Sequence, residues 1–282
     1  MKKILILGST GLLGKNLSIF LSKNYKVYKH SNSKKSEFIY DLTKYDNIKK
    51  IINISKPNII INCVGYTNVD DCENNFNKAY EINAKINLNL SKILIKKNIL
   101  LIHISTDQVY SNKYKNYSSE NLINLINNYA ISKYLGEIYL TKLKKTIILR
   151  TNFFGYGDKF RKNSFCNWIL QSAKKNIKIN LANDIYFNPI SINSFCKIIE
   201  YVIQNPVEGT YNLGSKNGIS KYNFAILLLK HLNINSSNIL KSNLKNLGLE
   251  AVRPKNMLMD CKKFETTYNI RLPNIQNEIN NL

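Results

Sequence analysis

The first half of the chain alternates short apolar runs with stretches of helical spacing. Apolar runs at residues 4–7, 59–64, 100–105 and 146–150 predict strands, and residues 26–29 predict a shorter one. Residues 12–23, 48–54, 76–97 and 129–144 carry apolar side chains at helical intervals. The run 59–64 is apolar without alternation, which is typical of a strand covered on both faces. This repeated order predicts an α/β fold with a doubly wound, parallel sheet and right-handed crossovers.

The regular alternation ends near residue 150. Helices are expected near residues 164–174, 191–204 and 221–232, with a strand at 210–213 and an irregular segment over 233–260. We therefore predict a dinucleotide-binding domain over residues 1–150 and a smaller, less regular substrate-binding lobe over 151–282. No linker rich in Pro, Gly or Ser separates them, so the lobe is expected to interleave with the sheet rather than to fold alone.

The charge and the cysteine content indicate which partners and which cellular compartment to expect. The 282 residues carry 41 Lys and Arg against 18 Asp and Glu, a net charge of +23. These cations are spread along the whole chain rather than clustered, which argues against a nucleic-acid or membrane partner and leaves long-range attraction of an anionic substrate. Five cysteines without a C-x-x-C spacing predict buried thiols and neither disulfides nor a metal site. The apolar run at 4–7 is too short for a signal peptide, and we expect a cytoplasmic protein.

A glycine-rich turn follows the first predicted strand. Gly8, Gly11 and Gly14 form G-x-x-G-x-x-G, with Thr10, Leu12 and Leu13 between them. Glycines there permit a tight turn and let the backbone approach a pyrophosphate at the N-terminus of the next helix. The position between the first strand and the first helix indicates a Rossmann-type NAD(P) site.

The end of the second strand bears on which dinucleotide is bound. An acidic residue there would hold the ribose hydroxyls of NADH, but residues 29–35 contain none. Small polar and basic groups, with Ser31 among them, could instead hold a 2′-phosphate. This pattern favours NADPH and leaves NADH open.

Tyr129 and Lys133 form a Y-x-x-x-K pair on a predicted helix. Residues four apart share a helix face, so the lysine lies beside the phenol and favours its ionised form. The spacing alone is weak, because Tyr25 and Lys29 also show it. Only the pair at 129 and 133 opens the helix that follows the strand ending in Ser-Thr-Asp, at the edge where such sheets bind ligands. Tyr129 is therefore the predicted proton donor, and Thr106 is predicted to bind the carbonyl oxygen.

Several stretches, in order along almost the whole chain, resemble the dTDP-4-dehydrorhamnose reductases, a family of extended short-chain dehydrogenases/reductases. They are residues 56–73, 81–84, 105–107, 149–151, 253–260 and 270–273.

The resemblance implies NADPH- or NADH-dependent reduction of the C4 keto group of dTDP-4-dehydro-L-rhamnose to dTDP-L-rhamnose, a precursor of cell-surface polysaccharides such as lipopolysaccharide. Tyr129, Lys133 and Thr106 would be catalytic, and Tyr129 and Lys133 would also bind the cofactor. The further implied cofactor contacts are Asp41 and Leu42 at the adenine, Cys63, Val64 and Gly65 along the nicotinamide side, and Tyr66 and Asn83. The implied substrate contacts are Thr106, Asp107, Phe153 and Arg253.

Departures from the family pattern keep alternatives open. Gln108 replaces a frequent Tyr, Asn127 and Asn128 stand where a Pro is usual, and Ala130 replaces a Gly. Another 4-ketosugar reductase or an epimerase therefore stays open, while Gln108 cannot act as the acid that a 4,6-dehydratase needs. A non-catalytic regulatory subunit, as in methionine adenosyltransferase, is a further alternative. Some relatives form a magnesium-bridged dimer with an acid after the glycine motif. Lys15 and Asn16 stand there, so no metal is predicted and a homodimer is left open.

Overall fold

The computed structural model describes residues 1–32, 36–111, 117–156 and 164–282. Its main element is a seven-stranded sheet. The strand order is β11-β6-β5-β4-β1-β2-β3, and β1 pairs in parallel with β2 and β4. The strands are β1 (Lys3–Leu7), β2 (Lys26–Ser31), β3 (Phe38–Ile39), β4 (Ile59–Asn62), β5 (Leu100–Thr106), β6 (Thr146–Thr151) and β11 (Gly209–Leu213). The predicted α/β fold with a doubly wound Rossmann-type sheet is confirmed.

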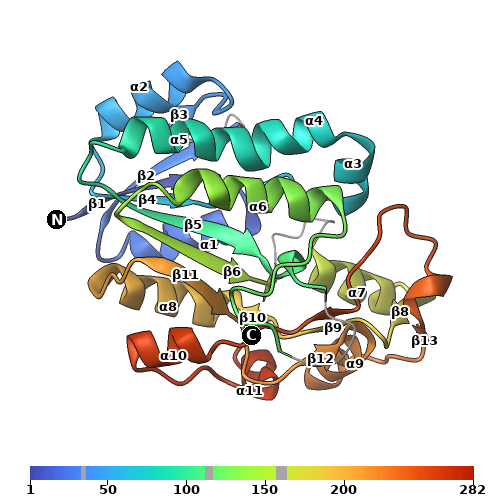
Figure 1. Cartoon of the computed structure of the whole chain (residues 1–282). Helices are drawn as coiled ribbons and strands as arrows, with labels where there is room; N and C mark the ends of the chain where they lie inside the picture. Colours follow the sequence, from blue (N-terminus) through green and yellow to red (C-terminus); the bar gives the residue numbers. More distant parts are fainter. Residues whose placement is uncertain (33–35, 112–116, 157–163) are drawn as a thin grey trace. The chain divides into compact units, whose positions relative to one another are not determined.

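Helices cover both faces of this sheet. Helices α2 (Tyr45–Ser55), α5 (Ile86–Leu94) and α6 (Asn128–Leu140) lie over one face, and α1 (Leu12–Leu21) lies on the other (Figure 1). Strands β1, β4 and β5 are buried along nearly their whole length, which explains their unbroken apolar sequence. The strand order reverses beside β1, so the ends of β1 and β4 lie where open α/β sheets bind ligands.

The long helix predicted over residues 76–97 is only partly regular. After α3 (Val69–Asn74), the chain forms α4 (Phe76–Ala79), a π-helical segment η1 (Tyr80–Lys85) and then α5. Asn83 lies in the π-helical segment, and its carbonyl oxygen accepts a hydrogen bond from Asn87 Nδ2 at 3.0 Å. Hydrophobic spacing does not reveal such an insertion, because the extra residue is accommodated without ending the helix.

The chain divides into two compact units of discontinuous sequence. The first comprises residues 1–106, 127–150 and 199–211, and the second comprises 107–126, 151–198 and 212–282. The division at residue 150 into a cofactor domain and a substrate lobe stays a prediction about function. Each unit has its own apolar core, around Leu5, Ile60 and Leu101 in the first and around Phe187, Phe224 and Leu228 in the second.

The second unit is built from short elements. They are η2 (Asp107–Val109), β7 (Phe153–Phe154), α7 (Phe165–Lys174), β8 (Ile179–Ala182), β9 (Tyr186–Phe187), β10 (Ile190–Ser191), β12 (Ile219–Ser220), α9 (Lys221–His231), β13 (Ile239–Ser242), η3 (Leu244–Asn246), β14 (Asn256–Met257), α10 (Lys262–Tyr268) and α11 (Ile275–Asn280), while α8 (Ile192–Gln204) has residues in both units. The expectation of an irregular segment over 233–260 was partly wrong. Strand β13 pairs in parallel with β8, and β14 pairs with β9. Strands of two to four residues carry too few alternating positions to be detected from sequence.

No helix in the described part of the chain is long and apolar enough to cross a bilayer. The five cysteines are free thiols, and all but Cys63 are buried.

Replacing Gly136 by alanine should lower the free energy of unfolding by about 1–3 kcal/mol, although alanine is normally better than glycine inside a helix. The new Cβ would lie 2.3 Å from the Asn83 carbonyl oxygen and 2.5 Å from Asn87 Nδ2. Urea unfolding of the variant measures the effect. Gly65→Ala is the control, since its Cβ would approach nothing closer than 3.4 Å, a methyl group of Thr67. Unchanged or higher stability of Gly136→Ala would contradict the close packing of α6 on η1.

Candidate active site

The glycine loop joins β1 to α1. Gly8 has φ +80°, a conformation that glycine adopts without strain. A Cβ on Gly14 would lie 2.2 Å from the Gly8 carbonyl oxygen, so only glycine allows this approach. Helix α1 begins at Leu12 and has no acidic residue in its first turn. A glycine turn that leads into a helix N-terminus, where the helix dipole favours negative charge, is typical of pyrophosphate-binding sites.

Other predicted cofactor residues lie in the same unit. Tyr66 and Asn83 are joined by two hydrogen bonds, from Tyr66 N to Asn83 Oδ1 at 2.8 Å and from Asn83 Nδ2 to the Tyr66 carbonyl at 3.0 Å. Cys63 and Val64 directly follow β4, and Ser31 ends β2 as a buried residue. Residues 33–35 of the predicted 2′-phosphate segment lie outside the described residues.

The predicted adenine contacts have different surroundings. Asp41 is exposed, and its Oδ1 accepts hydrogen bonds from the backbone and side chain of Thr43 at 2.9 and 2.8 Å. The side chain of Leu42 is buried in the apolar core of the first unit. Leu42 can therefore reach a ligand through its backbone more readily than through its side chain.

Tyr129 and Lys133 lie one turn apart near the start of α6, and both are buried. Asn127 begins the helix, with its side chain accepting a hydrogen bond from Ala130 N at 2.8 Å. Lys133 Nζ donates a hydrogen bond to the carbonyl oxygen of Ile104 in β5 at 2.7 Å. This bond fixes the lysine against the strand that ends in Thr106, so all three predicted catalytic residues belong to two adjoining elements.

Burial lowers the pKa of Lys133 to about 8, because the charged ammonium loses its hydration. The Glu137 carboxylate and Cys63 act in the opposite direction and raise the pKa of this lysine. His103, fully buried in β5, has its pKa lowered by burial and by the Lys133 charge. An ammonium with such a pKa changes its charge near neutral pH, which suits a group that must assist proton transfer.

A buried ion pair lies beneath these residues. Glu137 Oε2 accepts a hydrogen bond from Arg150 at 2.6 Å, and Glu137 also accepts one from the hydroxyl of Ser105. The three residues belong to α6, β6 and β5 and are all buried. The sequence drew attention to Ser105 only as part of the Ser-Thr-Asp end of its strand, and it did not single out Glu137. The one signal that could have pointed to the Glu137–Arg150 pair is an acid four residues after Lys133.

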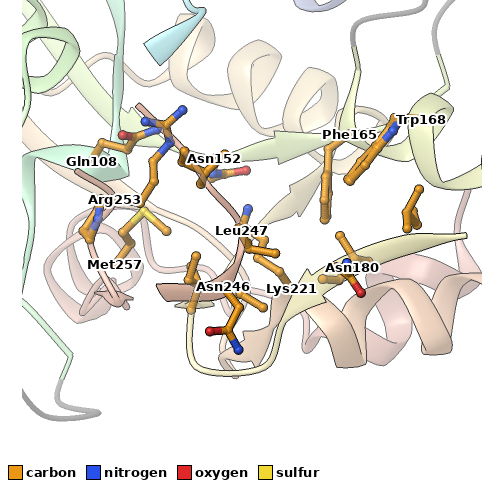
Figure 2. Close-up of a pocket in the computed structure, with 16 residues that line it drawn as sticks. Gln108, Asn152, Phe165, Trp168, Asn180, Lys221, Asn246, Leu247, Arg253 and Met257 are labelled. Atoms are coloured by element: carbon orange, nitrogen blue, oxygen red, sulfur yellow. The ribbon is translucent and has the colours of Figure 1, made fainter. Parts of the chain in front are cut away.

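The second unit contains a pocket of about 600 Å³. Gln108, Asn152 and Arg253 are among its lining residues, and Figure 2 shows Phe165 and Trp168 at the other end from Gln108 and Arg253. The predicted substrate residue Asp107 is buried and accepts a hydrogen bond from Asn152 Nδ2 at 2.8 Å.

The other two predicted substrate residues differ in position. Arg253 lines the pocket and donates to the Ala251 carbonyl at 3.0 Å. Phe153 is not among the lining residues and packs against Phe195, with ring centroids 6.0 Å apart. The aromatic side chains that do line the pocket, Phe165 and Trp168, were missed, because their helical spacing looks like ordinary packing.

Lys221 is a further lining residue that sequence analysis missed. It is the first residue of α9, and the lysine-rich composition concealed it. Burial lowers its pKa to about 8, while the charges of Asp107 and Cys166 raise it.

The parallel sheet and the glycine loop at the start of α1 define a Rossmann-type dinucleotide-binding protein, and the Tyr–Lys pair on α6 is of the kind used for proton transfer to a carbonyl oxygen. The family model described as RmlD substrate binding domain matches residues 1–282. The chain belongs to this family.

Similar proteins agree with that membership. A dTDP-4-dehydrorhamnose reductase from Aggregatibacter actinomycetemcomitans is 28% identical, covering 100% of this chain and 98% of the relative. The solved structure of a dTDP-4-dehydrorhamnose reductase from Bacillus anthracis in complex with NADP is 25% identical, with a TM-score of 0.91 and coverage of 100% and 98%. Methionine adenosyltransferase 2 subunit beta from Rattus norvegicus is 23% identical, covering 94% of this chain and 82% of the relative.

Glu137→Gln should lower the free energy of unfolding by about 3–5 kcal/mol, because it removes the carboxylate charge that pairs with the buried Arg150 cation. Denaturant unfolding of the variant measures this. Glu81→Gln is the matched control: Glu81 pairs with Lys85 at 2.7 Å, but both side chains are about 40% exposed, and an exposed pair contributes under about 1 kcal/mol. Equal losses in the two variants would show that burial does not set the strength of the Glu137–Arg150 pair.

Proposed function

We propose that this chain is an oxidoreductase that uses NADPH to reduce the C4 keto group of a nucleotide-activated 6-deoxysugar, with dTDP-4-dehydro-L-rhamnose as its substrate and dTDP-L-rhamnose as its product. The observation that carries the proposal is the buried Tyr129–Lys133 pair on α6, in a chain whose family membership extends over all 282 residues. NADPH, when bound, supplies the hydride.

The residues of the glycine loop and of strand β2 fit NADPH, the dinucleotide that carries a 2′-phosphate. Gly14 lets the start of α1 pack against the Gly8 carbonyl, since a Cβ at Gly14 would lie 2.2 Å from that oxygen. A helix N-terminus directly after such a glycine turn is the arrangement that binds a pyrophosphate. Strand β2 ends in Ser31 and contains no acidic residue, so nothing in that strand repels a 2′-phosphate. Support for NADPH also comes from the Bacillus anthracis relative, whose structure is a complex with NADP.

We assign each catalytic side chain one task. Tyr129 holds the proton that the developing alkoxide receives. Lys133, in its charged form, stabilises the phenolate left behind, and Thr106 donates a hydrogen bond to the ketone oxygen. Asp107 and Gln108 follow Thr106 directly in sequence, and Gln108 lines the pocket of the second unit, so consecutive residues serve the reacting carbonyl and the remainder of the substrate.

The pocket and the charge of the chain support an anionic nucleotide-sugar as the partner. We propose a cytoplasmic enzyme, in keeping with its free thiols. A measurement of the molecular mass in solution would distinguish a monomer from a homodimer. A regulatory role like that of the methionine adenosyltransferase subunit is the second candidate, favoured by the similarity to that relative. A regulatory subunit would not depend on the Tyr129 hydroxyl.

Turnover is tested by loss of NADPH absorbance with dTDP-4-dehydro-L-rhamnose. Tyr129→Phe should reduce kcat by at least 100-fold, because general acid catalysis typically contributes a factor of about 10²–10⁴. Tyr139→Phe is the matched control on the same helix: its hydroxyl shares a hydrogen bond of 3.1 Å with the hydroxyl of Tyr80, and the substitution should leave kcat within about twofold. Tight NADPH binding without any turnover would reject the reductase and favour the regulatory role.

The pH profile tests the charge of Lys133. Its pKa of about 8 means that the ammonium is protonated below pH 8 and loses its charge above it. We therefore expect kcat/KM for NADPH oxidation to fall as the pH rises through about 8. The same profile measured with Lys221→Arg separates the two lysines, since arginine keeps its charge throughout. A flat profile from pH 7 to 9.5 in both proteins would contradict the role given to Lys133.

A further inference from the structure

Lys221 has unusual surroundings for a lysine. Its ammonium lies 3.3 Å from the centroid of the Phe187 ring and 4.8 Å from that of the Phe165 ring. Such cation–π contacts recover only part of the interaction energy that a desolvated ammonium loses with its hydration shell. In a structure where most lysines are exposed, this one is held between two aromatic rings at the wall of a cavity.

The placement of Lys221 is defined by its own backbone. Its N–H donates to the Ile185 carbonyl at 3.0 Å, and Ser220 before it begins α9 by accepting a hydrogen bond from Asn223 N at 3.1 Å. The side chain therefore starts from a rigid point at a helix N-terminus. A lysine that served only to fill space there could be replaced by an apolar residue of similar length without the cost of desolvating a charge.

The lining of the pocket is positively charged. Among its described lining residues, Lys221 and Arg253 are cations and none is a carboxylate. Asp107 acts on Lys221 electrostatically, but its Oδ2 accepts a hydrogen bond from Asn152. Apolar side chains, including Leu181, Leu247 and Met257, make up much of the remaining wall.

The order of these groups along the pocket matches a particular ligand. Figure 2 shows Phe165 and Trp168 at one end, Arg253 and Gln108 at the other, and Lys221 between them. A planar, largely apolar group fits the aromatic end, and an anion fits the two cations. A nucleoside phosphate has these two parts in this order.

We propose that Lys221 is a phosphate-binding and specificity-determining residue of the substrate pocket, which makes the site select phosphorylated nucleotides over nucleosides. The inference rests on the proposed function and assigns to that site a residue beyond Arg253. The pKa of about 8 supports it, because an approaching phosphate would keep the ammonium charged at neutral pH.

Trp168 provides a test that is independent of turnover. It is the only tryptophan of the chain, lies in the pocket wall and is 41% exposed, so its fluorescence reports on ligand binding. Thymidine, dTMP and dTDP are titrated into the enzyme with NADP⁺ present. The variants are Lys221→Met, Lys221→Arg and, as a matched control, Lys230→Met at the exposed end of α9.

Lys221→Met should weaken binding of dTDP and dTMP by roughly 10- to 100-fold, as expected for loss of one charged hydrogen bond, and should change thymidine binding by less than about threefold. Lys221→Arg should retain most of the affinity for both nucleotides, and Lys230→Met should match the wild type. Circular dichroism and thermal unfolding of Lys221→Met check that the fold is retained.

Two results would overturn the proposal. Unchanged dTDP affinity in Lys221→Met would make the lysine a purely structural residue, and equal losses for all three ligands would place it at the nucleoside end instead. Failure of the proposed function gives a different result. If the wild type binds dTDP with loss of affinity in Lys221→Met but oxidises no NADPH, the role of Lys221 stands and the reductase assignment falls.

Discussion

The buried ion pair of Glu137 and Arg150 is the interaction on which the candidate active site depends. It joins α6, which carries Tyr129 and Lys133, to β6, and the Ser105 hydroxyl adds β5, which ends in Thr106. Three separate elements are thereby held in one arrangement. A buried pair of this kind contributes little net stability compared with apolar packing, because both ions lose their hydration. Its value here lies in position, since it fixes the helix face that presents the phenol and the ammonium.

Two desolvated lysines, Lys133 and Lys221, carry the proposed roles in proton transfer and in phosphate binding. Lys133 lies against the backbone of β5, and Lys221 lies on the ring of Phe187. In both, burial lowers the pKa to about 8 and a nearby acid acts in the opposite direction, Glu137 for the first and Asp107 for the second. Most of the other lysines in the described part of the chain are exposed, and the excess of Lys and Arg over the whole sequence gives the net charge of +23. The overall charge can attract an anionic substrate from a distance, whereas these two lysines act over a few ångströms.

Close backbone contacts constrain the rest of the site. Gly14 lets α1 approach the Gly8 carbonyl, and Gly136 lets α6 approach the π-helical segment that carries Asn83. Asn83 in turn bonds to Tyr66 and to Ser132, which lies between Tyr129 and Lys133. Asn83 thus connects the predicted cofactor residue Tyr66 with the catalytic helix α6. The close approach of α6 to Asn83 leaves no space for a Cβ at Gly136.

The sequence by itself determined the parallel sheet, the glycine loop and the Tyr129–Lys133 pair, because these depend on local periodicity and on spacing within a few residues. It could not reveal the π-helical segment, the short strands after residue 233 or the Glu137–Arg150 pair. Only the tertiary structure decided which of many lysines are desolvated, since desolvation depends on what distant segments such as Phe165 and Phe187 place around a side chain. It also placed Arg253 at the pocket wall and Phe153 outside it. Desolvation and charge pairing arise from contacts between side chains of different elements, and so they cannot be derived from spacing within one element.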